Sequence, residues 1–166
     1  MTFADLMAGD KVFLDANTLV YHFTRDPVYG PACSQLLQRI ENQEVCGLTS
    51  THVLTETAHR IMTIEAIGAF GWPVAGVAQR LRRHPGQIQS LTGFRQAVER
   101  ILQSQIQVVT IPMGLVAAGA KLSQLTGLLS NDALIVAIMQ VNGLTNIASN
   151  DADFDRVPGI TRYAPV

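Results

Sequence analysis

Short apolar segments with strand character alternate with helical segments along all 166 residues of the chain. Strands are expected at residues 11–14, 44–48, 106–111 and 146–149, and a fifth at 161–163. Strands that are separated by helices join through crossovers, so they form a mostly parallel sheet that helices cover on both faces. The pattern therefore predicts an α/β fold of three layers, an α/β/α sandwich, around a central sheet of four to five strands.

Proline, glycine and hydroxyl side chains mark the ends of the expected helices. Pro31 opens one helix, Thr49–Thr51 offers N-caps for another, Gly127 ends a third, and Ser130 is expected to cap a fourth. The expected helices lie at about 31–41, 51–62, 74–83, 94–104, 113–126 and 131–142.

Length and composition favour one domain, residues 1–166, with a single core. No apolar stretch reaches the length of a membrane span, and the first residues lack the basic region of a signal peptide. Cys33 and Cys46 have no zinc-like spacing. We therefore expect reduced thiols, a cytoplasmic protein and no contact with a membrane.

The segment from about residue 65 to 104 differs in charge from the rest of the chain. From residue 66 to 104 it carries five arginines and only one acidic residue, although the whole chain has a net charge of −1. Arg80, Arg82 and Arg83 form the densest part of this basic segment. Such a cluster is most often a solvated surface, but beside an acidic enzyme site it would bind the phosphates of a polyanion such as RNA.

Four acidic residues fall where the expected topology places ligands. Asp15 follows the first strand, Asp151 lies two residues after Ser149 at the end of the fourth, and Asp132 is in the first turn of a helix. Glu56 can reach the same edge from its helix. Because open α/β sheets bind ligands at the carboxyl ends of their strands, we expect these four side chains to share one crevice.

Each acid also has a purely structural explanation when it is taken alone. The negative charge of Asp132 would interact favourably with the dipole of its helix, and Glu56 could be solvent-exposed. Clustered carboxylates, however, resist ionisation unless a cation is present. Oxygen ligands of this kind suit Mg²⁺ or Mn²⁺. The histidines His22, His52 and His84 have no metal-ligand spacing and are interpreted as ordinary surface or hydrogen-bonded residues.

Four motifs resemble those of the PIN-domain family in order and spacing. Phe13–Asn17 is similar to the opening motif of an apolar pair, Asp and a polar residue, and Thr49–Glu56 is similar to the second, a helix that reaches Glu. Ser130–Ala137 resembles the third, an Asp that opens an alanine-rich helix. Ile147–Phe154 resembles the last, of the form Ser/Thr-x-Asp-x-Asp-Phe. Together the motifs span most of the chain.

The resemblance implies a PIN-like fold and an endoribonuclease that depends on Mg²⁺ or Mn²⁺. It also implies a VapC-like toxin, with RNA as substrate, a cognate antitoxin as partner and a homodimeric state. The implied metal and catalytic residues are Asp15, Glu56, Asp132 and Asp151, with Asn17, Ser149 and Asp153 as supporting groups. Asp151 is expected to bind the metal, directly or through water, and Asp153 to orient it. The segment at 65–104 is longer than the corresponding part of compact VapC-like toxins, and this is where the chain departs from the resemblance.

Two alternatives remain open from the sequence. Asp15–Leu19 is also similar to the Asp-x-Asp-x-Thr motif of haloacid-dehalogenase-like phosphatases, although Asn17 stands where the general acid would be. The second alternative is a catalytically silent PIN-like module that binds RNA or protein.

Overall fold

The computed structural model describes residues 1–166 and contains one five-stranded parallel sheet. The strand order is β3-β2-β1-β4-β5, and every neighbouring pair is parallel. The strands are β1 (Lys11–Leu14), β2 (Cys46–Ser50), β3 (Gln107–Val109), β4 (Asn146–Ala148) and β5 (Thr161–Tyr163). The expected α/β/α sandwich is therefore confirmed, including its fifth strand.

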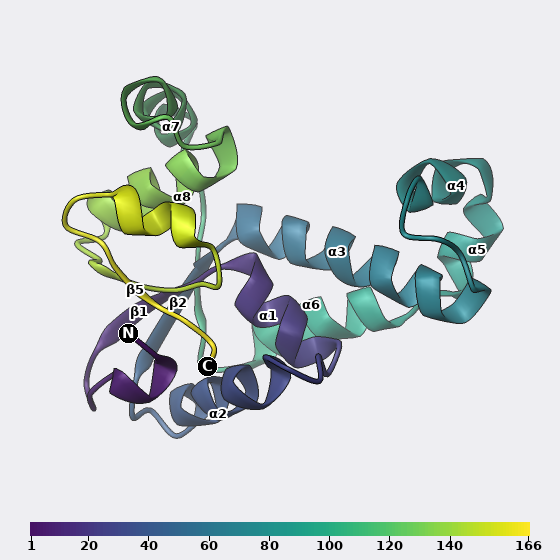
Figure 1. The fold of residues 1–166 in the computed structure, drawn as a ribbon, viewed down its shortest axis with the longest axis horizontal. Helices are drawn as coiled ribbons and strands as arrows, with labels where there is room; N and C mark the ends of the chain where they lie inside the picture. Colours follow the sequence, from purple (N-terminus) through teal and green to yellow (C-terminus); the bar gives the residue numbers. More distant parts are fainter.

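Helices cover both faces of this sheet (Figure 1). One side carries α1 (Ala16–Phe23) and α2 (Gly30–Glu41), and the other carries α7 (Met113–Thr126) and α8 (Ser130–Val141). The main core lies between these layers, where Phe13 on β1 is fully buried beside Leu48 and Ile147 on the neighbouring strands. Gly119 lets α7 approach α8, because a Cβ there would lie 3.0 Å from the Leu134 Cα.

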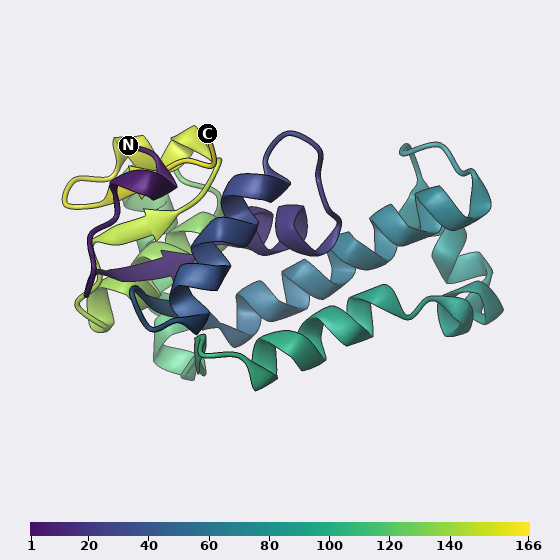
Figure 2. The same ribbon diagram turned by 90° about the horizontal axis from the view of Figure 1, so that it is seen from below.

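The segment at 65–104 forms a helical arm that projects from the sheet (Figure 2). It consists of the outer part of α3 (Thr51–Phe70), then α4 (Val77–Arg83), α5 (Pro85–Ser90) and α6 (Gly93–Gln103). A small separate cluster that includes Ala66, Leu81 and Leu91 packs the tip. The Glu65 carboxylate accepts hydrogen bonds from the backbone amides of Thr92 and Gly93, so α3 caps the start of α6.

Several expected boundaries need correction. The second strand was expected at 44–48 but lies at Cys46–Ser50, and the third is shorter than 106–111. Ser130 is not a side-chain cap: it is the first residue of α8, and its preceding residue Leu129 makes no capping bond. The helix expected at 74–83 begins at Val77, because Gly76 adopts a left-handed conformation with φ of 76°. Helices α1 and α5 were not expected.

The topology fixes where a ligand can approach. β1 is the central strand: the chain runs from it through β2 to β3 on one side, and then crosses back to β4 and β5 on the other side. The connections that follow β1 and β4 therefore leave in opposite directions, and open α/β sheets bind ligands in the crevice outside the carboxyl ends of the strands at such a point. No single helix is long and apolar enough to span a membrane, although α7 and α8, bent by 114°, reach that length and apolarity together.

Candidate acidic metal centre

Asp15 lies at the end of β1 and caps α1. Its side chain is 7% exposed, and its Oδ1 accepts a hydrogen bond of 2.6 Å from the Ala16 amide. Its Oδ2 accepts bonds from the Asn17 Nδ2 and from the Ser149 Oγ, the latter at 2.7 Å. A carboxylate has about four lone-pair sites, so three are occupied and one on Oδ1 remains for a ligand.

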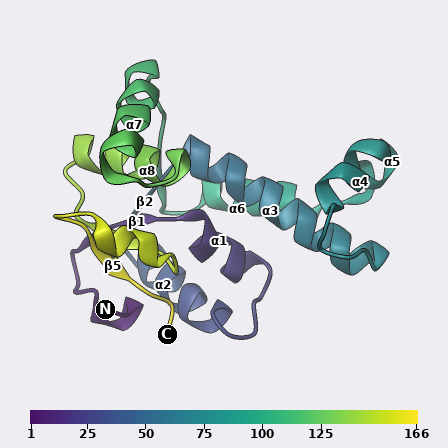
Figure 3. The ribbon, with the colours of Figure 1, turned by 45° about the horizontal axis from the view of Figure 1, so that its top comes forward.

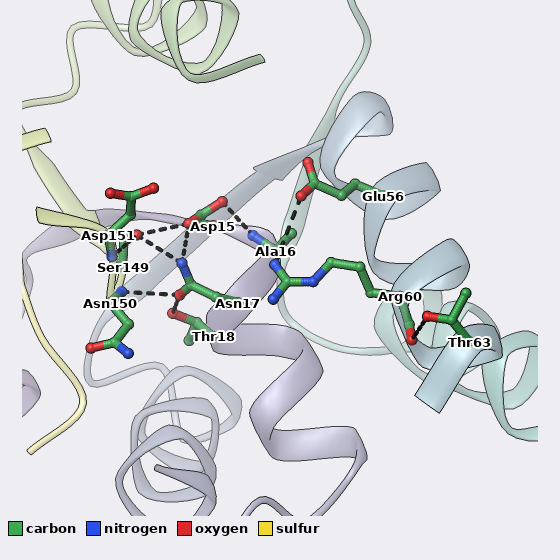
Figure 4. Close-up of polar contacts among 10 residues, drawn as sticks. All are labelled: Asp15, Ala16, Asn17, Thr18, Glu56, Arg60, Thr63, Ser149, Asn150 and Asp151. Atoms are coloured by element: carbon green, nitrogen blue, oxygen red, sulfur yellow. Dashed lines mark hydrogen bonds and ion pairs between the residues drawn. The ribbon is translucent and has the colours of Figure 1, made fainter. Parts of the chain in front are cut away.

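Polar side chains join the ends of β1 and β4 around Asp15 (Figure 4). The Asn17 Nδ2 also donates to Ser149 Oγ at 3.0 Å, and the Asn17 Oδ1 accepts from the Asn150 amide at 3.0 Å. The Thr18 hydroxyl donates to the Ala148 carbonyl at 2.8 Å. Because Asn17, Thr18 and Ser149 are buried, this network fixes the orientation of Asp15.

Three carboxylates gather on the other side of the crevice. Asp132, Asp151 and Asp153 each offer an oxygen within 4.8 Å of the others. Asp151 begins the short 3-10 helix η2 (Ala152–Arg156), where its Oδ1 accepts from the Asp153 amide at 2.9 Å. Its own amide donates to Ser149 Oγ at 3.0 Å, so the groups that hold Asp15 also position Asp151.

Asp153 lies nearer to the centre than the sequence indicated. Its carboxylate belongs to the three-acid group with Asp132 and Asp151, and it also pairs with Arg156 at 3.0 Å. Asp151 is the N-cap of η2 and Asp153 lies in its first turn, and this turn brings their carboxylates together. Both side chains are therefore within reach of one cation.

Glu56 approaches from α3 and pairs with Arg60, one helical turn later. Their charged atoms are 3.8 Å apart, and the two side chains are 30% and 39% exposed. Figure 4 shows both side chains extending toward Asp15. Arg60 was not among the residues expected at the site, although a Glu followed four residues later by Arg on a helix is a recognisable pairing pattern.

Burial and the negative charges of neighbouring acids raise the pKa values of two carboxylates in this group. Burial, together with the negative charges of Asp151, Asp15, Glu56 and Asp153, raises the pKa of Asp132 to about 6. Burial also raises the pKa of Asp15 to about 6; the bonds from Ser149 and Ala16 and the charge of Arg60 oppose this rise, while Glu56 adds to it. The structure therefore brings Asp15, Glu56, Asp132, Asp151 and Asp153 into one electrostatic unit.

The expected RNA-binding arginines lie elsewhere. Arg80, Arg82 and Arg83 are on α4 at the tip of the arm, away from the acids (Figures 1 and 2). The Arg80 Nη1 donates to the carbonyls of Pro73 and Ala75 at 3.4 and 3.3 Å, which holds the tip loop. Arg82 and Arg83 are exposed, so any RNA contact there is remote from the acidic centre.

The donor set fits a hard divalent cation. All the available ligand atoms in the group of Asp132, Asp151 and Asp153 are carboxylate oxygens, and no histidine or cysteine belongs to it. Mg²⁺ and Mn²⁺ prefer such oxygens, whereas zinc sites in proteins usually include nitrogen or sulfur. A positive charge would also relieve the repulsion that raises the pKa of Asp132.

Fold and site together define a parallel α/β/α protein with an acidic centre at the topological switch point. The family model of the PIN domain matches residues 12–160. The chain therefore belongs to the PIN domain family, which excludes the haloacid-dehalogenase-like alternative. A comparison with curated proteins finds no match.

Solved structures with the same fold include several toxins. VapC20 of Mycobacterium tuberculosis, described as a toxin that cleaves the sarcin-ricin loop, has 17% identity and a TM-score of 0.60, with 87% of this chain and 92% of that chain covered. VapBC2 of Rickettsia felis, bound to promoter DNA, has 16% identity and a TM-score of 0.56, with coverage of 93% and 98%. A toxin–antitoxin complex from Klebsiella pneumoniae has 18% identity and a TM-score of 0.52, with coverage of 90% and 95%.

Proposed function

We propose that this protein is an endoribonuclease that depends on Mg²⁺ or Mn²⁺ and acts as the toxin of a toxin–antitoxin pair. The observation that carries the proposal is the convergence of five carboxylates from four separate parts of the chain: Asp132, Asp151 and Asp153 each offer an oxygen within 4.8 Å of the others, and the other four acids all raise the pKa of Asp132. A protein gains nothing in stability from such repulsion, so the arrangement points to a bound cation.

Different side chains would bind the metal, position its ligands and bind the phosphate of the substrate. A divalent cation, if bound there, would lower the pKa of a water molecule and would stabilise the charged oxygens of a phosphodiester. Asp132, Asp151 and Asp153 supply oxygen ligands, and Asp15 offers its remaining lone pair. Asn17 and Ser149 hold Asp15 in place. Arg60 is the cation beside Glu56 and is suited to bind a phosphate of the substrate.

The toxin assignment rests on the family and on the complexes that share the fold. Two of the similar structures contain a toxin with its antitoxin or the VapBC pair, and we propose a cognate antitoxin for this chain as well. We also propose a homodimer in the cytoplasm. Apolar side chains of and beside α7 support a partner copy, since Met113 is 88% exposed and Leu125 and Leu129 are each 73% exposed.

The direct test is cleavage of single-stranded RNA by the purified protein with Mg²⁺, with Mn²⁺ and with a chelator. We expect cleavage only with metal, and a loss of at least 100-fold in the Asp132→Asn variant. Glu99→Gln is the matched control, because Glu99 lies on the arm and pairs only with Arg95.

A catalytically silent binding module is the competing hypothesis. It predicts RNA or antitoxin binding without cleavage under any metal condition. Cleavage that persists unchanged in Asp132→Asn would instead show a contaminating nuclease and would remove the support for this centre.

A further inference from the structure

A cavity of about 540 Å³ lies beside the acidic centre, between α3, α7 and α8. One wall is apolar and includes Ile111, Val116 and Leu134. Residues that adjoin the proposed metal ligands form part of its lining: Asn131 precedes Asp132, and Thr55 precedes Glu56. Along both α3 and α8, the lining of the cavity therefore comes within one residue of an acid of the centre. Figure 3 shows α7 and α8 beside the beginning of α3.

The polar part of the lining has unused hydrogen-bonding capacity. Thr55 donates to the Thr51 carbonyl at 3.0 Å, whereas the side chains of Thr51, Ser130 and Asn131 have no partner within the chain. The His52 Nε2 is buried and also has no partner. His52 is thus not the hydrogen-bonded or plain surface residue that the sequence suggested. A buried nitrogen without a partner is unfavourable and calls for an explanation.

His52, Glu56 and Arg60 form a single stripe along α3, because residues four apart share a face of a helix. The stripe is about 12 Å long, at a rise of 1.5 Å per residue. Glu56, one acid of the centre, lies in the middle of the stripe, Arg60 lies at its outer end, and His52, which lines the cavity, lies at its inner end. A single strand laid along the stripe would place a base in the cavity when a phosphate is at the carboxylates.

We infer that this cavity is a subsite for one unpaired nucleobase next to the cleaved phosphodiester, an inference that rests on the proposed ribonuclease function. Proteins recognise single-stranded RNA by stacking splayed bases on rings such as imidazole and by hydrogen bonds to the base edges. His52 and the apolar wall supply the stacking surface. Asn131, which offers both a donor and an acceptor, reads the base edge.

The test measures binding of ten-nucleotide homopolymers of A, C and U by fluorescence anisotropy with Mg²⁺. The parent protein carries Asp15→Asn, which preserves the shape of the site and is expected to stop cleavage. We expect its three affinities to differ by about 10-fold, within the range that one stacked and hydrogen-bonded base contributes. Adding His52→Ala or Asn131→Ala should bring the three affinities within about 2-fold of one another.

Gln140→Ala is the matched control, because Gln140 is an exposed amide at the other end of α8; it should keep the parent's pattern. Asn131 is exposed, so its variant tests the inference even if His52→Ala fails to fold. Equal affinities in the parent, or an unchanged spread in both variants, would overturn the subsite. A change of molar mass by light scattering in Asn131→Ala would assign the cavity to a second copy instead.

Cleavage of the same homopolymers by the protein with Asp15 intact separates the two proposals. A spread of affinities without cleavage by any metal would leave the base subsite standing and reject the nuclease. Cleavage of the homopolymers together with equal affinities for all three would support the nuclease and reject the base subsite.

Discussion

The Ser149 hydroxyl donates to the Asp15 carboxylate over 2.7 Å, although 134 residues separate the two in sequence. The bond joins the end of β4 to the end of β1, and the same Ser149 oxygen accepts from the Asp151 amide. One buried hydroxyl therefore positions an acid on each side of the crevice.

Replacing Ser149 with alanine should weaken the centre without removing any carboxylate. The bond lowers the pKa of Asp15, so in Ser149→Ala this pKa should rise above about 6. We expect metal affinity to fall by about 10- to 100-fold, and the acid limb of the pH–rate profile to move to higher pH. Ser90→Ala at the arm tip is the control; an unmoved acid limb in Ser149→Ala would count against this role.

Stability without metal should fall as pH rises. Asp15 and Asp132 have pKa values of about 6 in the folded protein, above the value near 3.9 of an unfolded Asp. Between these values the folded state binds more protons than the unfolded state, so the free energy of unfolding decreases from about pH 4 to above pH 6. Melting temperatures in a chelator from pH 4.5 to 7.5 measure this slope, which Asp132→Asn should reduce.

Divalent metal should reverse that loss at neutral pH. A cation bound only to the folded state at 100 times its dissociation constant adds about 2.7 kcal/mol, which is roughly 5–10 °C in melting temperature for a domain of this size. Mn²⁺ should thus raise the melting temperature more at pH 7.5 than at pH 4.5. An equal rise at both pH values, or the same rise in Asp132→Asn, would contradict binding at these carboxylates.

Asp151→Ala should be at least as damaging to cleavage as Asp153→Ala. Asp151 is held at its backbone by Ser149, whereas the Asp153 carboxylate is shared with Arg156. Metal titration and cleavage rates of both variants give the comparison, with Asp155→Ala as the control for a nearby acid that pairs with Arg162. If Asp153→Ala abolished cleavage and Asp151→Ala left it near normal, the two roles would be reversed.

The arm-tip arginines are expected to contribute to RNA affinity through phosphates alone. Because Arg80 holds the tip loop, the informative variant is the pair Arg82→Ala and Arg83→Ala. It should weaken binding of a long single strand and reduce the slope of log affinity against log salt by about 0.7 for each lost phosphate contact. An unchanged slope would show that these side chains are only solvated.

Glu65 should stabilise the arm. Its carboxylate accepts from two amides at the start of α6, so Glu65→Ala should cost about 0.5–2 kcal/mol, as the loss of a helix cap does. Chemical denaturation measures this cost, and limited proteolysis should cut faster at residues 71–92. Glu99→Ala, which removes an exposed pair on the same arm, should cost only about 0.3–0.5 kcal/mol.

The sequence by itself determined the order of the five strands and of most helices, and the positions of the acids at the ends of these elements. The alternation of strand and helix segments was enough to predict a parallel sheet. Helix α7 ends at Gly127, which has a φ of 70°, as expected. These features depend on residues close together in the chain, so local patterns are enough to predict them. The placement of Asp15 and Asp151 after strands needed no more than the rule that such ends meet at one edge.

Tertiary structure decided which side chains meet. Arg60 belongs to the site because α3 places it beside Glu56. The carboxylate of Asp153 lies close to that of Asp132 because of the turn of η2. Arg82 and Arg83 lie on α4 at the tip of the arm, far from the acids, although their charge alone suggested that they would bind RNA. The raised pKa values of Asp15 and Asp132 depend on burial and on charges from distant segments. Only the packing of α3, α8 and η2 around the end of β1 sets those distances, and no local pattern in the sequence contains them.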